Sequence, residues 1–341
     1  MLARFADIDG CSVATPSMAV PEAELHVART IGAPDPAFVA EIAERRPAAT
    51  WQPFVATVPE AELRGPDPAV YRDGLLVYES LWDRDHFMRS HARLERARHA
   101  PVVGADRAAT ILSLWYDNYY HWLVDVLPRL AVLRAAGVPE LPVVTPAQCT
   151  SFQDGSLRSL GITDRRLPFA GPRMTFDTLV WPSGLDPIGF PSPRTAAWLR
   201  HAFLEDLTPS SPRTRLYVRR SSRTIANERE VSEVLDRFGL DVVQPETLSF
   251  AEQVRLFSQA ELVLGCHGAG MTNSVFARPG ARIIELFQPG YINLSMYRLV
   301  RSAGMRYRYL VGRAAGPRRR GKNRDIVVDT VPLVSLLAAP E

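Results

Sequence analysis

Apolar and polar residues alternate in the second half of the chain in a pattern that predicts strands and helices in turn. The expected strands are 216–220, 241–245, 261–265 and 282–287, and the expected helical segments are 227–239, 249–260 and 268–280. Ser249 and Glu252, three residues apart, form the capping box that opens a helix. Four strands with three intervening helical segments predict a Rossmann-like α/β domain.

A similar alternation begins near residue 111. Apolar residues 111–115 predict a buried strand, and residues 118–137 predict a helix that is capped by Asp117 or Asn118 and stopped by a glycine. A second short strand is expected at 142–146. Strand, helix and strand in this order predict a βαβ unit and a parallel sheet.

The remaining stretches set the domain boundaries. Residues 1–100 combine prolines, an Asp-Gly turn and short apolar runs, which predicts a β-rich segment. Residues 181–195 contain four prolines and form the candidate linker. We therefore expect a β-rich segment at 1–100, a Rossmann-like domain at 101–190 and a second one at 191–341. A small-molecule site is expected in a cleft between the two domains.

Composition narrows the class of protein. The chain has 341 residues, of which 46% are hydrophobic and 23% are charged. This balance excludes a disordered chain, a collagen-like fibre and a polytopic membrane protein. The net charge of +3 provides no global attraction for nucleic acid. Three widely separated cysteines and an amino terminus without a secretory h-region predict a cytoplasmic protein.

One charged segment departs from this balance. Five basic residues gather within 318–324, in a stretch that also contains glycine and proline. One interpretation is a solvated loop. The other is a patch for anionic lipid head groups or a phosphorylated acceptor, which predicts peripheral contact with an anionic membrane surface.

The strongest candidate for a binding site is the glycine-rich turn after the strand at 261–265. Gly268 and Gly270 have no Cβ, so that a phosphate could approach the backbone at the start of the following helix, where Thr272 and Asn273 also lie. His267 lies on the rim and could donate to an anionic oxygen. Glu285 ends the next strand, where a carboxylate could accept two ribose hydroxyls. The spacing differs from the dinucleotide-binding GxGxxG, so a nicotinamide cofactor is disfavoured.

A second turn carries arginines. Arg220 leaves the strand at 216–220, Arg223 follows in the turn, and Asn227 opens the next helix. Guanidinium groups match phosphate oxygens with a planar fork. The two turns are expected at one sheet edge as a pyrophosphate site that needs no metal, since no DxD pair or His/Cys cluster suggests one.

A third constellation lies on the helix at 118–137. His121 and Asp125 are four residues apart and therefore share a helix face. Either the histidine, oriented by the aspartate, or the aspartate itself could act as a general base. The alternative is an ordinary solvated face of an amphipathic helix.

Together these stretches resemble glycosyltransferase family 61. The resemblance rests on NYYHWLVDVLPRL (118–130), RRSSRTIANERE (219–230) and the continuous run from Leu248 to Leu286. Residue by residue it maps the family's functional positions onto Arg220, Arg223, Asn227, Glu228, His267, Gly268, Ala269, Gly270 and Glu285. Where the family often has Ser-Arg at the strand end, this chain has Arg219 and Arg220.

The resemblance implies a GT-B-like pair of Rossmann-like domains, the first holding the acceptor and the second the nucleotide sugar. It implies an inverting glycosyltransferase of bacterial type that needs no metal or other cofactor. The expected reaction moves a sugar from a nucleoside-diphosphate donor, with UDP as the expected nucleotide, to a glycan or glycolipid in surface polysaccharide synthesis. The alternatives are a nucleotide-sugar epimerase, another polysaccharide-modifying transferase, and a catalytically silent subunit that binds the nucleotide sugar.

Overall fold

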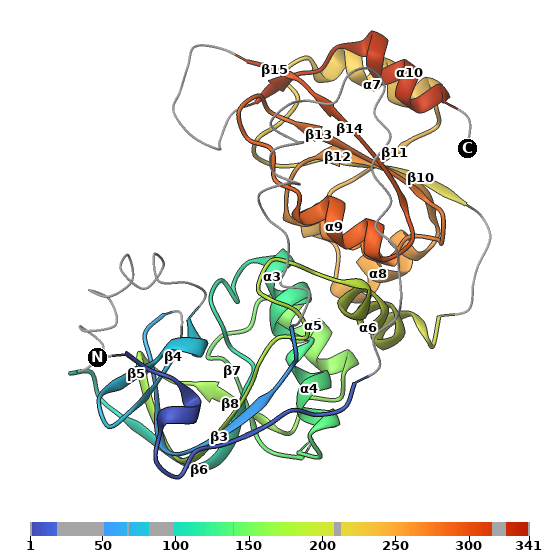
Figure 1. Ribbon diagram of the computed structural model, residues 1–341. Coiled ribbons are helices and arrows are strands. Elements are labelled where there is room, and N and C mark those ends of the chain that lie inside the picture. Colours follow the sequence, from blue (N-terminus) through green and yellow to red (C-terminus); the bar gives the residue numbers. More distant parts are fainter. Residues whose placement is uncertain are drawn as a thin grey trace. The chain divides into compact units, whose positions relative to one another are not determined.

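The chain divides into two compact units. The computed structural model describes residues 2–18, 51–66, 68–81, 99–138, 140–207, 213–315 and 325–339 (Figure 1). The described residues up to Gly189 form the first unit and those from Phe190 onward form the second. The basic cluster at 318–324 lies outside the described residues, and its proposed contact with a membrane surface stays a prediction. Each unit is described by itself below.

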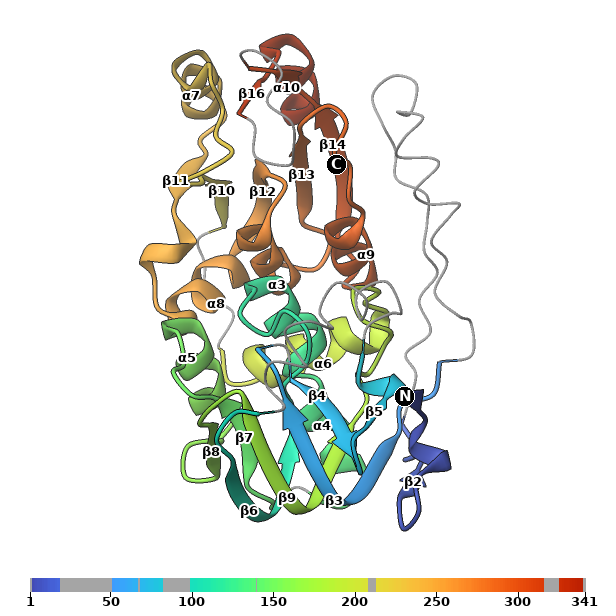
Figure 2. The same ribbon diagram turned by 90° about the vertical axis from the view of Figure 1, so that its left-hand side faces the viewer.

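The first unit is built on one nine-stranded mixed sheet with the order β1-β5-β4-β3-β9-β6-β7-β8, and β2 pairs with β3. Its strands are β1 Leu2–Ala3, β2 Ser12–Ala14, β3 Val55–Arg64, β4 Ala69–Arg72, β5 Leu75–Val77, β6 Val103–Thr110, β7 Val143–Pro146, β8 Arg166–Phe169 and β9 Arg173–Pro182. Strands β9, β6, β7 and β8 are mutually parallel, and β3 runs antiparallel to β9 (Figure 2). The expected parallel βαβ unit is therefore confirmed, and the N-terminal strands extend its sheet.

The Asp73-Gly74 turn joins β4 to β5. Both residues have positive φ angles, 49° for Asp73 and 74° for Gly74. Positive φ at both central residues is the backbone conformation of a tight type I′ hairpin. Glycine adopts this conformation freely and aspartate more readily than most residues. The local sequence therefore correctly indicates the hairpin.

The predicted strand at 111–115 is wrong. Strand β6 ends at Thr110, and the Leu112 N–H donates to the Thr110 Oγ1 at 3.2 Å. The chain then turns at Trp115, whose φ is 57°. Ile111, Leu112 and Leu114 of this run are buried. A short apolar run indicates that its residues are buried. It does not show whether the backbone is a strand or irregular, because both can be buried.

The single helix expected at 118–137 is interrupted. It consists of α3 Tyr119–His121, a five-residue π-helical turn η3 Trp122–Val126 and α4 Arg129–Ala135. Pro128 has no N–H and its ring would crowd a carbonyl four residues back in a regular helix. The backbone instead widens, and the Leu127 N–H donates to the Trp122 carbonyl five residues back at 2.9 Å. The Asn118 cap and the stop at Gly137, which has a φ of 73°, are confirmed.

The second unit holds a five-stranded parallel sheet with the order β11-β10-β12-β13-β14. Its strands are β10 Thr214–Val218, β11 Asp241–Val243, β12 Ala260–Cys266, β13 Arg282–Phe287 and β14 Arg306–Val311, and a separate two-stranded ribbon is formed by β15 Arg313–Ala314 and β16 Ile326–Val327. In chain order the sheet reads 2-1-3-4-5, the doubly wound arrangement that reverses direction between its first and third strands. The four predicted strands are confirmed, and β14 is a fifth that the sequence did not indicate.

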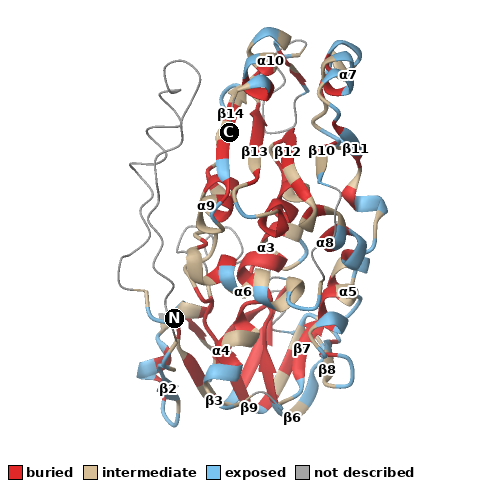
Figure 3. Cartoon of the chain, turned by 90° about the vertical axis from the view of Figure 1, so that its right-hand side faces the viewer, coloured by how far each residue is buried: buried red, intermediate tan, exposed pale blue. Residues whose placement is uncertain are grey.

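Helices cover both faces of this sheet. The helices of this unit are α6 Pro193–Leu204, α7 Glu228–Arg237, α8 Phe250–Ser258, α9 Ser295–Ser302 and α10 Thr330–Ala338. It also has two 3₁₀ turns, η4 Pro245–Thr247 and η5 Ala269–Phe276. Helix α5 Ser151–Ser159 belongs to the first unit. Helices α7 and α10 lie on one face, and α8 and α9 on the other (Figure 1). The capping box of Ser249 and Glu252 is present at α8. Buried residues follow the strands of both units (Figure 3).

The described residues contain neither a membrane-spanning helix nor a cluster of metal ligands. None of their helices is both long and apolar enough to cross a membrane. No group of three or more His, Cys, Asp or Glu side chains in the described ranges is arranged to hold a metal ion. Metal independence, the facing of two domains across a cleft and the cytoplasmic location stay predictions.

Candidate functional site

The sheet of the second unit places two turns side by side. Strand β10 ends at Val218, which pairs with Gly265 near the end of the parallel neighbour β12. These two strands flank the point where the strand order reverses, and open α/β sheets bind ligands beyond the strand ends at this point. Arg220 follows β10 and His267 follows β12, so the expected meeting of the two turns at one sheet edge is confirmed.

Arg220 and the glycine-rich turn interlock. The Arg220 Nη1 donates to the His267 carbonyl oxygen at 2.5 Å, and the Nε donates to the Ser222 carbonyl at 3.1 Å. A Cβ on Gly268 would lie 1.2 Å from the Arg220 Nη1. The glycine is therefore needed to admit the arginine side chain, and the close approach of a phosphate to its backbone stays a prediction.

Gly270 has a different environment. A Cβ there would lie 3.6 Å from Val218 and 3.7 Å from Pro245, which is ordinary van der Waals contact. Its φ angle lies outside the left-handed region, so the backbone does not demand glycine either. Packing within the protein therefore gives no reason for a glycine at this position.

The charges at this edge are unbalanced. Burial, and then the neighbouring Arg223, lower the pKa of Arg220 from its ordinary value. Within the described ranges neither guanidinium has a carboxylate partner in an ion pair, whereas Arg219 is paired with Glu228 at 2.8 Å. Two adjacent cations without a paired carboxylate favour the binding of an anion.

The loop of Arg223 is held in a strained conformation. Arg223 has a φ of 57°. This value lies in the left-handed region that non-glycine residues rarely adopt. The backbone on its C-terminal side is fastened to the β16 segment: the Thr224 N–H donates to Asp325 Oδ1 and the Ala226 N–H donates to the Ile326 carbonyl, both at 2.7 Å. Strain of this kind persists where the surroundings fix it, which is common at functional sites.

Asn227 belongs to this fastening. Its Nδ2 donates to the Val328 carbonyl and its Oδ1 accepts from the Val328 N–H, both at 2.9 Å. Both the oxygen and the nitrogen of the Asn227 side-chain amide are therefore hydrogen-bonded to the Val328 backbone. This bonding argues against the direct contact between Asn227 and the sugar donor that the sequence predicts. Nothing local in the sequence signals the partner, since it lies 101 residues away.

His267 forms a hydrogen-bonded pair with a buried carboxylate. Its Nδ1 lies 2.6 Å from the Glu285 Oε1, and its ring stacks on Phe287. Glu285 is completely buried, and its other oxygen accepts from the Tyr307 hydroxyl. The carboxylate of Glu285 is therefore inaccessible and each of its oxygens has a protein partner, so burial argues against the expected contact with ribose hydroxyls, which stays a prediction.

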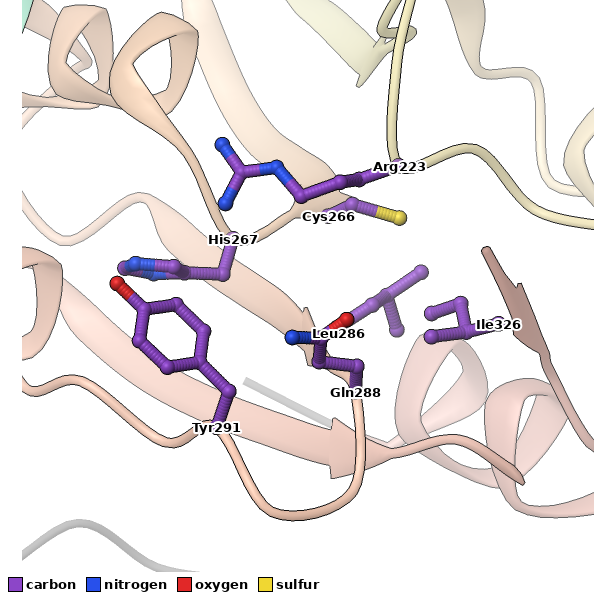
Figure 4. A pocket seen from close by; sticks show the side chains of 7 residues that line it. All are labelled: Arg223, Cys266, His267, Leu286, Gln288, Tyr291 and Ile326. Carbon is purple, nitrogen blue, oxygen red and sulfur yellow. The ribbon is translucent and has the colours of Figure 1, made fainter. Parts of the chain in front are cut away.

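A small pocket opens beside this pair. It encloses about 260 Å³, including the solvent at its mouth. It is lined by Arg223, Cys266, His267, Leu286, Gln288, Tyr291 and Ile326. Figure 4 shows the Arg223 guanidinium and the Tyr291 ring on either side of His267. Gln288 and Tyr291 follow β13, so the rule that sites lie beyond the ends of parallel strands could have identified them from the sequence.

The residues after the turn face the interior. The segment from Ala269 onward is the 3₁₀ turn η5, in which Thr272 and Asn273 are completely buried. The Asn273 Nδ2 donates to the Gln253 Oε1 of α8 at 2.8 Å. The Asn273 side chain therefore ties η5 to α8 and helps to hold the turn in place, and the donor contacts expected for Thr272 and Asn273 stay predictions.

The first unit contains the other predicted pair. The His121 Nδ1 lies 2.6 Å from the Asp125 Oδ2, so the shared helix face is confirmed. The side chain of Asp125 is 3% exposed and that of His121 is 17% exposed. The second carboxylate oxygen accepts from the Gly189 N–H at 2.9 Å. Burial of this pair excludes the interpretation as an ordinary solvated helix face.

Aromatic and cationic neighbours complete this arrangement. The Trp115 ring packs on His121 with centroids 4.6 Å apart. Arg129 is buried, donates to the Asp125 and Pro182 carbonyls, and lies over the Trp181 ring. Burial lowers the pKa of Arg129 to about 10. Sequence reasoning missed Arg129, although an arginine within an apolar helical run is a usable signal.

Part of the chain is similar in sequence to known proteins. Residues 119–284, just under half of the chain, match the sequence model of the family described as Glycosyltransferase 61. An 82-residue segment is 33% identical to Xylan glycosyltransferase MUCI21 of Arabidopsis thaliana. This segment covers 23% of the present chain and only 17% of the plant protein. The two matches support a place for the chain in glycosyltransferase family 61, while the expected bacterial type stays a prediction.

Proposed function

We propose that the protein is an inverting glycosyltransferase that uses a nucleoside-diphosphate sugar. The observation that carries the proposal is the meeting of Arg220 and Arg223, without paired carboxylates among the described residues, at the reversal point of a doubly wound sheet. A diphosphate supplies the missing negative charge. The match to the glycosyltransferase family favours this ligand over other anions.

The two arginines and His267 would stabilise the leaving group. As the bond between the anomeric carbon and the β-phosphate oxygen breaks, its electron pair remains on the diphosphate. Fixed donors aimed at this developing charge lower the barrier because they need no reorganisation. Their positive charge can serve the purpose for which other transferases use a metal ion, and this is the basis for proposing a metal-independent reaction.

His121 is the proposed base. Both oxygens of Asp125 accept hydrogen bonds, and its side chain is almost completely buried, so the aspartate fits the part of an orienting group. The acceptor hydroxyl would attack the anomeric carbon with inversion and give its proton to His121 Nε2. The sequence left the choice between His121 and Asp125 open, and the geometry favours the histidine.

A polysaccharide or other glycan is the proposed acceptor. The plant relative carries xylan in its name, and the family match covers both the His121 helix and the arginine turn. Surface polysaccharide synthesis is proposed on this basis.

Calorimetric titration with UDP, other nucleoside diphosphates and their sugars tests the proposal. Arg220→Ala and Arg223→Ala should each weaken binding about 10-fold or more, the value of a charge-assisted hydrogen bond. Arg219→Ala is the matched control, since that arginine is already paired with Glu228. It should change affinity less than about threefold, as ordinary surface substitutions do. Equal affinity in all three variants would refute the site. Tight binding without sugar transfer to any glycan would instead indicate the catalytically silent subunit.

A further inference from the structure

A buried chain of hydrogen bonds leads from the sheet interior to the proposed diphosphate site. The Tyr307 hydroxyl donates to one oxygen of Glu285, and the other oxygen lies 2.6 Å from His267 Nδ1. Tyr307 and Glu285 come from β14 and β13, which pair in parallel, and both side chains are buried. His267 stands at the solvent-facing end of this series of hydrogen bonds, and its side chain is 13% exposed.

The direction of the hydrogen bonds follows from the chemistry of the groups. Burial, and then the neighbouring Glu285, raise the pKa of Tyr307 well above its ordinary value, so its hydroxyl keeps the proton and donates it. An ionised carboxylate can only accept hydrogen bonds, so in that form Glu285 is the acceptor in both of its contacts. When Glu285 is ionised, the 2.6 Å contact therefore requires a proton on His267 Nδ1. Its Nε2 makes no hydrogen bond within the described part of the chain.

This arrangement has a consequence for anion binding. A neutral imidazole with its proton on Nδ1 presents a bare acceptor at Nε2, which repels phosphate oxygens. Only the doubly protonated ring can donate to Glu285 and to a phosphate at the same time. Arg220 and Arg223 oppose this second positive charge, whereas the Glu285 carboxylate favours it at close range.

We propose that Glu285 and Tyr307 are positioning residues that make His267 bind the diphosphate as a doubly protonated imidazolium. The second proton comes from solvent. The inference rests on the proposed function and deepens it, because it assigns the buried carboxylate as the counter-charge of the histidine. Other titratable groups around His267 are Cys266, next to it in the chain, and Tyr291, whose ring packs against the edge of the imidazole.

Nitrogen NMR of the full chain labelled with ¹⁵N-histidine tests the proposal directly. In the UDP complex at pH 8, both ring nitrogens of His267 should carry protons, and the signal is assigned by its loss in His267→Gln. In Glu285→Gln the bound ring should carry one proton, and the dissociation constant for UDP should rise about 10-fold. Tyr307→Phe should raise it about threefold to 10-fold.

Tyr297→Phe is the matched control for Tyr307→Phe. The two rings are packed 5.2 Å apart, but only Tyr307 donates to Glu285. The control should leave UDP affinity and the His267 signals unchanged. Tyr307→Phe retains the buried ring and keeps the test available if Glu285→Gln does not fold.

The outcomes separate this inference from the proposed function. A singly protonated His267 in the UDP complex, or wild-type affinity in both Glu285→Gln and Tyr307→Phe, overturns the positioning role and leaves the transferase proposal standing. Failure of the wild-type chain to bind any nucleoside diphosphate overturns both.

Discussion

The substitution Gly268→Ala tests the interlocked turn with a single methyl group. The added Cβ would lie 1.2 Å from the Arg220 Nη1 and 2.3 Å from its Cζ. Gly268 has a φ of 163° and a ψ of 170°, an extended conformation that alanine adopts without strain. Because the obstructed atoms are the far end of a flexible side chain, we expect the guanidinium to move away while the backbone stays in place.

The expected effect is on binding. Displacement removes the hydrogen bond from Arg220 to the His267 carbonyl and takes the guanidinium out of the proposed diphosphate site. A hydrogen bond that involves a charged group contributes about 1.5–3 kcal/mol, so the affinity for UDP should fall roughly 10- to 100-fold. The midpoint of thermal unfolding should change little, since no core side chain is moved.

Calorimetric titration of UDP into four proteins measures this effect: the wild type, Gly268→Ala, Arg220→Ala and the double variant. If the methyl group acts only through the arginine, the double variant should bind no more weakly than Arg220→Ala alone. Gly270→Ala is the matched control, since the nearest atom to its new Cβ lies 3.6 Å away. Its affinity should stay within about threefold of wild type. Wild-type affinity in Gly268→Ala would refute the interlocking argument.

Four further predictions concern other parts of the chain. His121→Ala should lower kcat about 10²- to 10⁴-fold with little change in the KM for the donor, and Asp125→Asn should lower it less, as measured in steady-state transfer assays. Asn227→Ala removes two hydrogen bonds that fasten the arginine loop. It should reduce the free energy of unfolding by about 1–3 kcal/mol in urea titrations and weaken UDP binding. Burial opposes ionisation of Glu62, a residue of β3, but its hydrogen bonds and ion pairs with Arg64 and Arg173 outweigh burial and lower its pKa. Its contribution to stability is therefore complete above the unfolded value of about 4.3 and is lost as the pH falls through the lower folded value, so the difference in Tm between wild type and Glu62→Gln should shrink from pH 6 to pH 3. Burial raises the pKa of Cys266 to about 12. This thiol should therefore remain unmodified by a thiol reagent at pH 8 until denaturant is added.

The elements with strong local signals were predictable. Helix α8 has a capping box within four residues, and β12 and β13 are apolar runs bounded by glycines and polar residues. The break in the 118–137 helix was also predictable in principle, since Pro128 stands within it. The expectation of one continuous helix followed the apolar periodicity and ignored the rule that a proline interrupts a helix.

The inward direction of the site carboxylate was harder to predict. Every residue of β13 after Arg282 is buried, because helices cover both faces of the sheet. Alternation of apolar and polar residues, which assigns side chains to faces in a half-exposed strand, therefore carries no information here. The partners Tyr307 and Val328 are joined to the site by pairings distant in sequence, for which a single chain offers no local signal.

Among the described residues, two histidine–carboxylate pairs share an Nδ1-to-oxygen separation of 2.6 Å, and their surroundings support different proposed functions. Beside His267 stand Arg220 and Arg223, which form no ion pair with a carboxylate among the described residues and therefore favour an anion. Beside His121 stand Asp125 and the buried Arg129, whose charges balance. In that neutral setting a phosphate has little attraction, whereas an uncharged hydroxyl can approach and give up a proton. A histidine fixed by a carboxylate is therefore not evidence of a particular role; the neighbouring arginines decide whether it holds a leaving group or accepts a proton.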